Sequence, residues 1–70
     1  MKKLTNNQQR VLSFIEDFIK RKGYAPTRSE ITNNLWFNSD NAAQQYIEAL
    51  SKKGAITVEP NIARSIVIVA

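Results

Sequence analysis

Residues 38–53 read NSDNAAQQYIEALSKK, and this stretch decides the fold. Its apolar residues recur at the spacing that lines one side of a helix, at Ala43, Tyr46, Ile47 and Leu50. The opposite side is mostly amide rather than charge, and it carries Asn41, Gln45, Glu48 and Lys52, flanked by Ala42 and Gln44. Asn and Gln side chains pair bidentately with adenine, so such a face is able to read DNA bases. A solvated face without any ligand is the alternative, and the stripe alone does not separate the two.

The 70 residues form one small domain, whose stability we expect to be about 3–5 kcal/mol. The sequence contains neither Cys nor His. This excludes disulfides, thiolate metal sites and the usual general base. Carboxylates paired at a plausible cleft spacing are missing as well. We therefore expect no enzyme, no metal and no cofactor, and no pattern for a small-molecule ligand is evident.

Ten Lys and Arg residues against six Asp and Glu residues give a net charge of +4, which favours a polyanionic partner. The basic residues gather at the ends of the expected elements, at positions 2–3, 20–22, 28 and 52–53. Cations at helix C-termini also complement the helix dipole without any ligand, so the charge pattern leaves both interpretations open. The longest apolar run, residues 66–70, is too short to cross a bilayer, and no signal peptide is recognisable. We expect a cytoplasmic domain with no membrane contact.

Three helices are expected, over about residues 6–22, 28–35 and 40–53. Thr5 with Gln8 and Thr27 with Glu30 both fit the capping box that begins a helix. Gly23 ends the first helix, because glycine accepts the positive φ of a C-terminal cap. Arg28 stands in the first turn of the second helix, where free backbone amides and a guanidinium together suit an anion; an exposed arginine without a partner is the alternative.

The second and third helices are joined by a short turn that contains Trp36 and Phe37. We expect the two aromatic rings to fill the core rather than to form a base-stacking platform, and a partly exposed ring is left open for Trp36. Ser39 is a natural N-cap for the third helix. This is the helix-turn-helix arrangement, whose second helix presents its N-terminal residues to base edges in the major groove. The expected base-reading residues are Ser39, Asn41, Ala42, Gln44 and Gln45.

After Gly54 the pattern changes to alternation with a period of two, and a β-branched run follows at residues 66–69. We expect a two-stranded antiparallel hairpin over about residues 55–69. The whole chain, residues 1–70, is therefore predicted to be a mainly α domain with a small β-hairpin, a winged helix-turn-helix. Arg64 lies near the wing and is a candidate for phosphate contact, with a solvated side chain as the alternative.

The sequence resembles the N-terminal DNA-binding domain of the LexA repressors, which regulate the SOS response. No gap is needed over nearly the whole chain. The resemblance rests on Leu4-Thr5 with Gln8-Gln9, Pro26-Thr27-Arg28-x-Glu30-Ile31, Leu35-x-Phe37, Asn41-Ala42-Ala43, Ala49-Leu50-x-x-Lys53-Gly54 and Arg64-x-Ile66. It implies a domain that binds double-stranded operator DNA, with bases read by the third helix. Arg28 and Lys53 match the family by position and are expected at the DNA backbone. Lys52 is expected there too, because it lies on the polar side of the third helix.

The sequence departs from that family at several positions. Acidic residues are common where Gln44 and Gln45 stand, and because Gln prefers adenine whereas Glu accepts from cytosine, we expect an operator that differs from the SOS box. Trp36, Asn61 and Ser65 replace residues that are often Gly, and Asp40 replaces a residue that is often Pro. The angle between the helices and the tip of the wing are therefore expected to differ.

The self-cleaving protease half of the LexA repressors does not follow Ala70, so both an excised domain and a short natural regulator remain open. The apolar C-terminal strand is expected to supply a weak contact between two copies on DNA. A winged helix that binds another protein is the alternative function. It is favoured by the near-neutral third helix, in which Asp40 and Glu48 offset Lys52 and Lys53.

Overall fold

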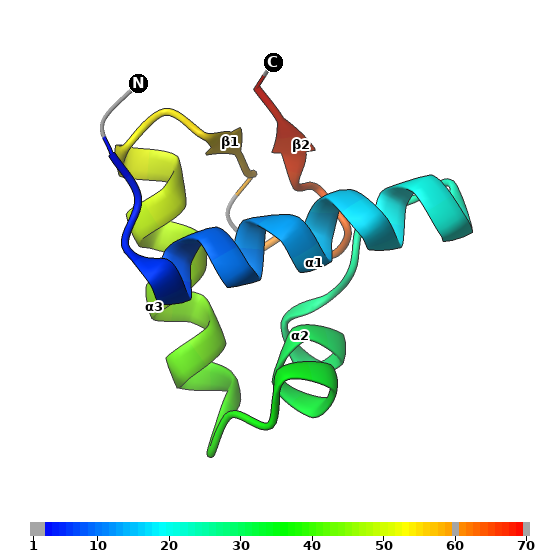
Figure 1. Cartoon of the computed structure of the whole chain (residues 1–70). Coiled ribbons are helices and arrows are strands. Elements are labelled where there is room, and N and C mark those ends of the chain that lie inside the picture. Colours follow the sequence, from blue (N-terminus) through cyan, green and yellow to red (C-terminus); the bar gives the residue numbers. More distant parts are fainter. Residues whose placement is uncertain (1–2, 60, 70) are drawn as a thin grey trace.

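The computed structural model describes residues 3–59 and 61–69. Three helices come first, α1 (Asn6–Lys22), α2 (Arg28–Leu35) and α3 (Asp40–Lys52), and the short strands β1 (Ile56–Thr57) and β2 (Val67–Ile68) follow. In Figure 1 α1 lies above α2, and α3 stands beside the N-terminal half of α1. The architecture is the winged helix-turn-helix that the sequence predicts, with the loop between β1 and β2 as the wing loop (residues 58–66).

Both predicted capping boxes begin their helices. The Thr5 hydroxyl accepts from the Gln8 N–H at 3.1 Å while the Thr5 N–H donates to the Gln8 side chain at 3.1 Å. Thr27 and Glu30 repeat the arrangement at the start of α2. Gly23 ends α1 with a φ of 81° and donates its N–H to the Ile19 carbonyl at 2.8 Å. These local interactions satisfy the helix-end groups that have no partner inside the helix.

The core lies where the three helices and the base of the hairpin meet. Its fully buried side chains come from all three helices and from β1, since Ile15, Ile31, Leu50 and Ile56 are all inaccessible to solvent or nearly so. Burying one such side chain stabilises the fold by about 1.5–3 kcal/mol. Ile66, also buried, anchors the return of the wing to this core. The apolar stripe of α3 thus faces inward, as its sequence period predicts.

The hairpin is shorter than the β-branched run suggests. Only two residue pairs form its ladder, Ile56 with Ile68 and Thr57 with Val67. Ile66 leaves the ladder to enter the core, and Val67 and Val69 point to solvent with 59% and 44% exposure. A ladder of this size is marginal without other contacts, so the wing depends on the helices for its position.

The expectation that both turn aromatics fill the core is wrong for Trp36. Phe37 is half-buried and stacks on Tyr46 with ring centroids 5.1 Å apart, but Trp36 is 88% exposed. Trp36 is the C-cap of α2 and adopts a left-handed backbone with φ of 61°. This conformation turns the chain toward α3. At the other end of α3, Lys53 is the cap rather than the last helical residue.

No helix in residues 3–59 and 61–69 is both long and apolar enough to cross a membrane.

Candidate nucleic-acid interface

The start of α3 is fixed to α2 by hydrogen bonds across the turn. The Ser29 hydroxyl donates to an Asp40 carboxylate oxygen at 2.9 Å, and the Thr32 hydroxyl donates to the Ser39 carbonyl at 3.4 Å. The neighbouring hydroxyls of Thr32 and Ser29 lower the pKa of Asp40, with a smaller contribution from the charge of Arg28. Asp40 is therefore a carboxylate that closes the turn, and its charge suits the N-terminus of a helix.

The predicted base-reading residues all lie on the first two turns of α3. Asn41 and Gln45 are exposed and one helical turn apart, and Gln44 is half-buried beside them. The Ser39 hydroxyl caps the helix by accepting from the Ala42 N–H at 3.3 Å, so its own O–H remains to donate. Ala42 is half-buried and offers a small apolar surface. The N-terminal half of α3 thus presents amides, a hydroxyl and a methyl group.

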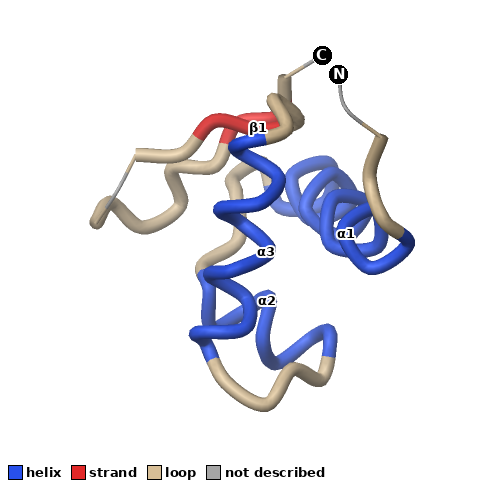
Figure 2. Tube along the Cα trace, turned by 90° about the vertical axis from the view of Figure 1, so that its left-hand side faces the viewer, coloured by secondary structure: helices blue, strands red, loops and turns tan. Residues whose placement is uncertain are grey.

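A groove of about 820 Å³ runs between α3, the start of α2 and the wing loop. Gln44, Glu48, Ser51 and Lys52 line it from α3, and Thr27, Arg28 and Ser29 line it from α2. Figure 2 shows the wing loop and α1 on opposite sides of α3, so the groove lies on the side away from α1. Gln45 and Ala42 border a shallower hollow on the α1 side, next to Gln8. Gln44 and Gln45 therefore lie toward different sides of α3.

The four cations expected at the DNA backbone divide into two kinds. Arg28 and Lys52 are exposed on the groove, and neither forms an ion pair within the described residues. Lys53 instead donates from Nζ to the Lys3 carbonyl at 3.0 Å and to the Gln8 side chain, which fastens the end of α3 to the start of α1. The hydrogen bonds of Lys53 serve the fold.

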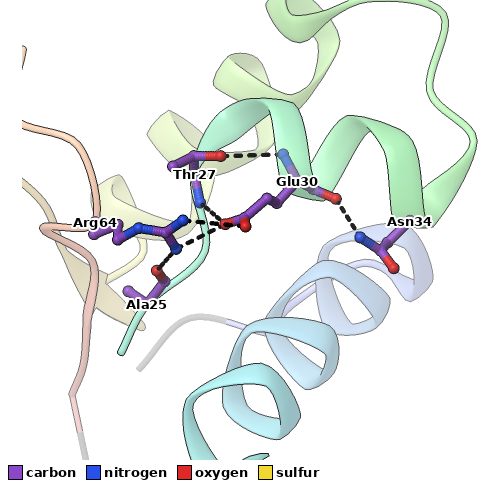
Figure 3. Close-up of polar contacts among 5 residues, drawn as sticks. All are labelled: Ala25, Thr27, Glu30, Asn34 and Arg64. Carbon is purple, nitrogen blue, oxygen red and sulfur yellow. Dashed lines mark hydrogen bonds and ion pairs between the residues drawn. The ribbon is translucent and has the colours of Figure 1, made fainter. Parts of the chain in front are cut away.

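Arg64 is not the solvated wing arginine that the sequence suggested as an alternative to phosphate contact. Its Nη1 donates to Glu30 Oε1 at 2.8 Å and to the Ala25 carbonyl at 2.9 Å, and its Nη2 donates to Glu30 Oε2 at 3.1 Å (Figure 3). The guanidinium carbon also lies 4.5 Å from the centre of the Tyr24 ring. These contacts leave the expected phosphate role of Arg64 without support, because the guanidinium already faces internal partners.

The Glu30 carboxylate accepts hydrogen bonds from two different segments of the chain. Besides Arg64, its Oε1 accepts from the Thr27 N–H at 2.9 Å within the capping box. The hydrogen bonds from Arg64 and from the Thr27 backbone lower the pKa of Glu30. Sequence reasoning found the cap but missed the ion pair, since 34 residues separate Glu30 from Arg64 and no local pattern links them. The same holds for Ser29 and Asp40, which meet only after the turn has formed.

The sequence matches the family model described as "LexA DNA binding domain" over residues 1–65. A LexA repressor of Hahella chejuensis is 50% identical over 66 residues, which cover 94% of this chain and 33% of the relative. A LexA repressor of Saccharophagus degradans is equally similar, at 50% over the same shares. A LexA repressor of Pseudomonas aeruginosa is 46% identical over 66 residues, which cover 94% of this chain and 32% of the relative. The chain spans about a third of the length of these relatives.

Proposed function

Since the chain belongs to the family of LexA DNA-binding domains, we propose that it reads a specific operator in double-stranded DNA as part of a transcriptional repressor. The observation that carries this proposal is the exposed amide-rich start of α3, which is capped, fixed to α2 and flanked by a wing. A helix with this support enters the major groove with its N-terminal residues toward the bases. The expected resemblance to the SOS regulators is thereby supported at the level of the family.

We assign base readout to the exposed polar groups at the start of α3. Asn41, Gln44 and Gln45 each offer an amide that fits the N6 and N7 edge of adenine. The methyl group of Ala42 suits the methyl group of thymine, and the Ser39 O–H suits an acceptor. A half-site rich in A·T pairs follows from this set, because no Arg or Lys stands among these residues to read guanine.

Phosphate contact falls to Arg28 and Lys52, the exposed cations on the groove that form no ion pair within the described residues. Arg28 stands in the first turn of α2, where helix-end amides add to its attraction for an anion. One monomer has few contacts of this kind, so we propose that two copies bind the two halves of a palindrome. The exposed Val67 and Val69 at the edge of the wing are suited to a weak contact between those copies.

A second candidate function is the recognition of another protein. The observation that favours it is Trp36, which exposes 88% of its surface at the turn before α3. Tryptophan is enriched at the centre of protein interfaces. A partner protein would then cover the turn and the start of α3 instead of DNA.

Selection of binding sites from a random pool of duplexes tests the two functions against each other. We expect enrichment of a short A·T-rich half-site, repeated with two-fold symmetry. For each copy bound, affinity for the selected duplex is expected to fall by about tenfold between 50 and 200 mM salt, because the two phosphate contacts of one copy release about two counterions. A pool without enrichment, or binding that does not change with salt, would exclude the DNA function and leave the protein-binding alternative.

A further inference from the structure

The wing loop has few interactions of its own to hold it in place. The Glu59 N–H donates to the Ser65 hydroxyl at 3.0 Å, and this hydroxyl donates to the Glu59 carbonyl at 3.0 Å, which closes the base of the loop. Between them, Ile62 is 61% exposed. Val58 and Ile66 pack on the core at the two ends of the loop, above a ladder of only two residue pairs, so the part of the loop between them needs a further contact to fix its position.

Arg64 supplies that contact. Within the described residues, every hydrogen bond from the wing loop to α2 or to the link before it begins at this guanidinium. A bidentate pair between Arg and a carboxylate fixes orientation as well as distance. The backbone of Arg64 is also left-handed, with a φ of 59°. A residue other than glycine persists in that conformation only where its surroundings hold it there.

The contact links two of the segments that line the groove. Arg64 and Glu30 join the wing loop to the start of α2 (Figure 3), and the groove is lined by residues of these two segments and of α3. The distance between the wing and α3 therefore depends on this pair. Any ligand that must touch both the wing and α3 depends on it too.

We propose that Glu30 and Arg64 are positioning residues that hold the wing at the distance from α3 at which both contact the same operator. The inference rests on the proposed DNA-binding function and adds a role for residues that do not read bases. In the absence of the pair, α3 still enters the major groove, but the wing samples several positions and its contacts are lost. Arg64 remains on Glu30 when DNA binds.

The substitution Glu30→Gln tests the proposal without destroying the cap of α2. In α1 a glutamine, Gln8, already occupies the corresponding place in a capping box, so glutamine is a competent capping residue in this chain. The substitution removes the negative charge that Arg64 requires. Glu59→Gln is the matched control, because it makes the same change of charge at a wing residue that lines the groove, and the Glu59 carboxylate forms no ion pair within the described residues.

Affinities are measured for the duplex selected by the wild-type protein and for a random duplex, and hydroxyl-radical footprints are recorded on the selected one. Glu59→Gln is expected to bind both duplexes at least as tightly as wild type, since it removes a negative charge near DNA. Glu30→Gln is expected to bind the selected duplex about five- to tenfold more weakly than Glu59→Gln, the size of one lost contact. Its footprint is expected to lose protection beside the wing and to keep protection over the α3 site.

Arg64→Lys is the second variant, because it keeps the charge, leaves the cap of α2 untouched and removes the bidentate geometry. Arg64→Lys is expected to lose the footprint protection beside the wing, as Glu30→Gln does. The double variant is expected to bind the selected duplex only slightly more weakly than Glu30→Gln alone. Equal affinity of Glu30→Gln and Glu59→Gln for the selected duplex would overturn the proposal. Tighter binding of the selected duplex by Glu30→Gln than by Glu59→Gln would overturn the proposal as well. That result would mean that Arg64, once released from Glu30, contacts phosphate. If the wild-type protein selects no duplex, the proposed function itself fails.

Discussion

Replacing Trp36 by glycine should stabilise the protein, although it removes the largest side chain in the sequence. Trp36 has a φ of 61° and a ψ of 34°, and its side chain is 88% exposed. A left-handed backbone costs a residue with a Cβ atom about 1–2 kcal/mol, and glycine avoids that cost. Glycine also makes the unfolded chain more flexible, which offsets about 0.5–1 kcal/mol. We expect a net gain of about 0.5–1 kcal/mol, or a rise in Tm of about 2–8 °C for a domain of this size.

The free energy of unfolding is measured by urea denaturation, followed by circular dichroism because Trp36 is the only tryptophan. Trp36→Ala separates the ring from the backbone, since alanine keeps the Cβ atom, and it should change stability by less than about 0.5 kcal/mol. Gly23→Ala is the converse control. An added Cβ atom would meet no atom within 4 Å there, so its expected cost, about 1 kcal/mol, comes from the φ of 81° alone. If Trp36→Gly or Trp36→Ala destabilised the protein by more than about 1 kcal/mol, the ring would have to contribute packing that its exposure contradicts.

Three further predictions follow from the core, the ion pair and the interface. Leu50→Ala should cost about 2–5 kcal/mol, because Leu50 is fully buried, and this consumes most of the expected stability; a folded variant with an unchanged urea midpoint would contradict it. The lowered pKa of Glu30 means that its contribution to stability is present above the ordinary value of 4.5 and is lost as pH falls through the folded value, so Tm should drop below about pH 4.5 in wild type and drop less in Glu30→Gln, as calorimetry between pH 2 and 7 will test. On the selected operator, Gln45→Ala should weaken binding by about 1–3 kcal/mol and relax the preference at one base pair, whereas Lys52→Ala should weaken binding to all duplexes and lower the salt slope by about one; gel shifts with single-base variants would refute this assignment if the two profiles were alike.

The helices and the core were predictable because their determinants are local. Thr5 and Gln8 lie three residues apart, and the cap forms from those residues whatever the rest of the chain does. The inward face of α3 follows in the same way from a period of 3.6 residues, and Leu50 lies where that period places it. Sequence spacing is sufficient information where the interacting groups belong to one helix.

The direction of a side chain at a turn was not predictable in this way. Trp36 and Phe37 are adjacent aromatic residues, and hydrophobicity assigns both to the core. The left-handed backbone at Trp36 sends one ring to solvent and leaves the other stacked on Tyr46. The conformation of a single residue decided the outcome, and that conformation depends on how α2 and α3 pack.

The roles of the cations were also beyond local reasoning. Lys53 and Arg64 are basic residues near the ends of elements, as Arg28 and Lys52 are, and composition does not tell them apart. Lys53 bonds to a carbonyl 50 residues away, and Arg64 bonds to a carboxylate 34 residues away. Only the packed fold brings these partners together, so only the fold separates cations that hold the domain from cations left unpaired on the groove within the described residues.

The placement of charge explains why this chain should depend on amides for recognition. The basic residues 20–22 form the last turn of α1, which Figure 1 shows at the end of that helix away from α3, and Arg21 pairs there with Asp17 at 2.9 Å. On the groove itself Arg28 and Lys52 are balanced by Glu48 and Glu59. Arg64 also lines the groove, but Glu30 neutralises it. A near-neutral groove attracts a phosphate backbone weakly, so the non-specific part of the affinity is small. The proposed amide contacts with base edges do not depend on this charge. With them, a larger share of the binding free energy depends on sequence, and a single copy should bind random DNA poorly.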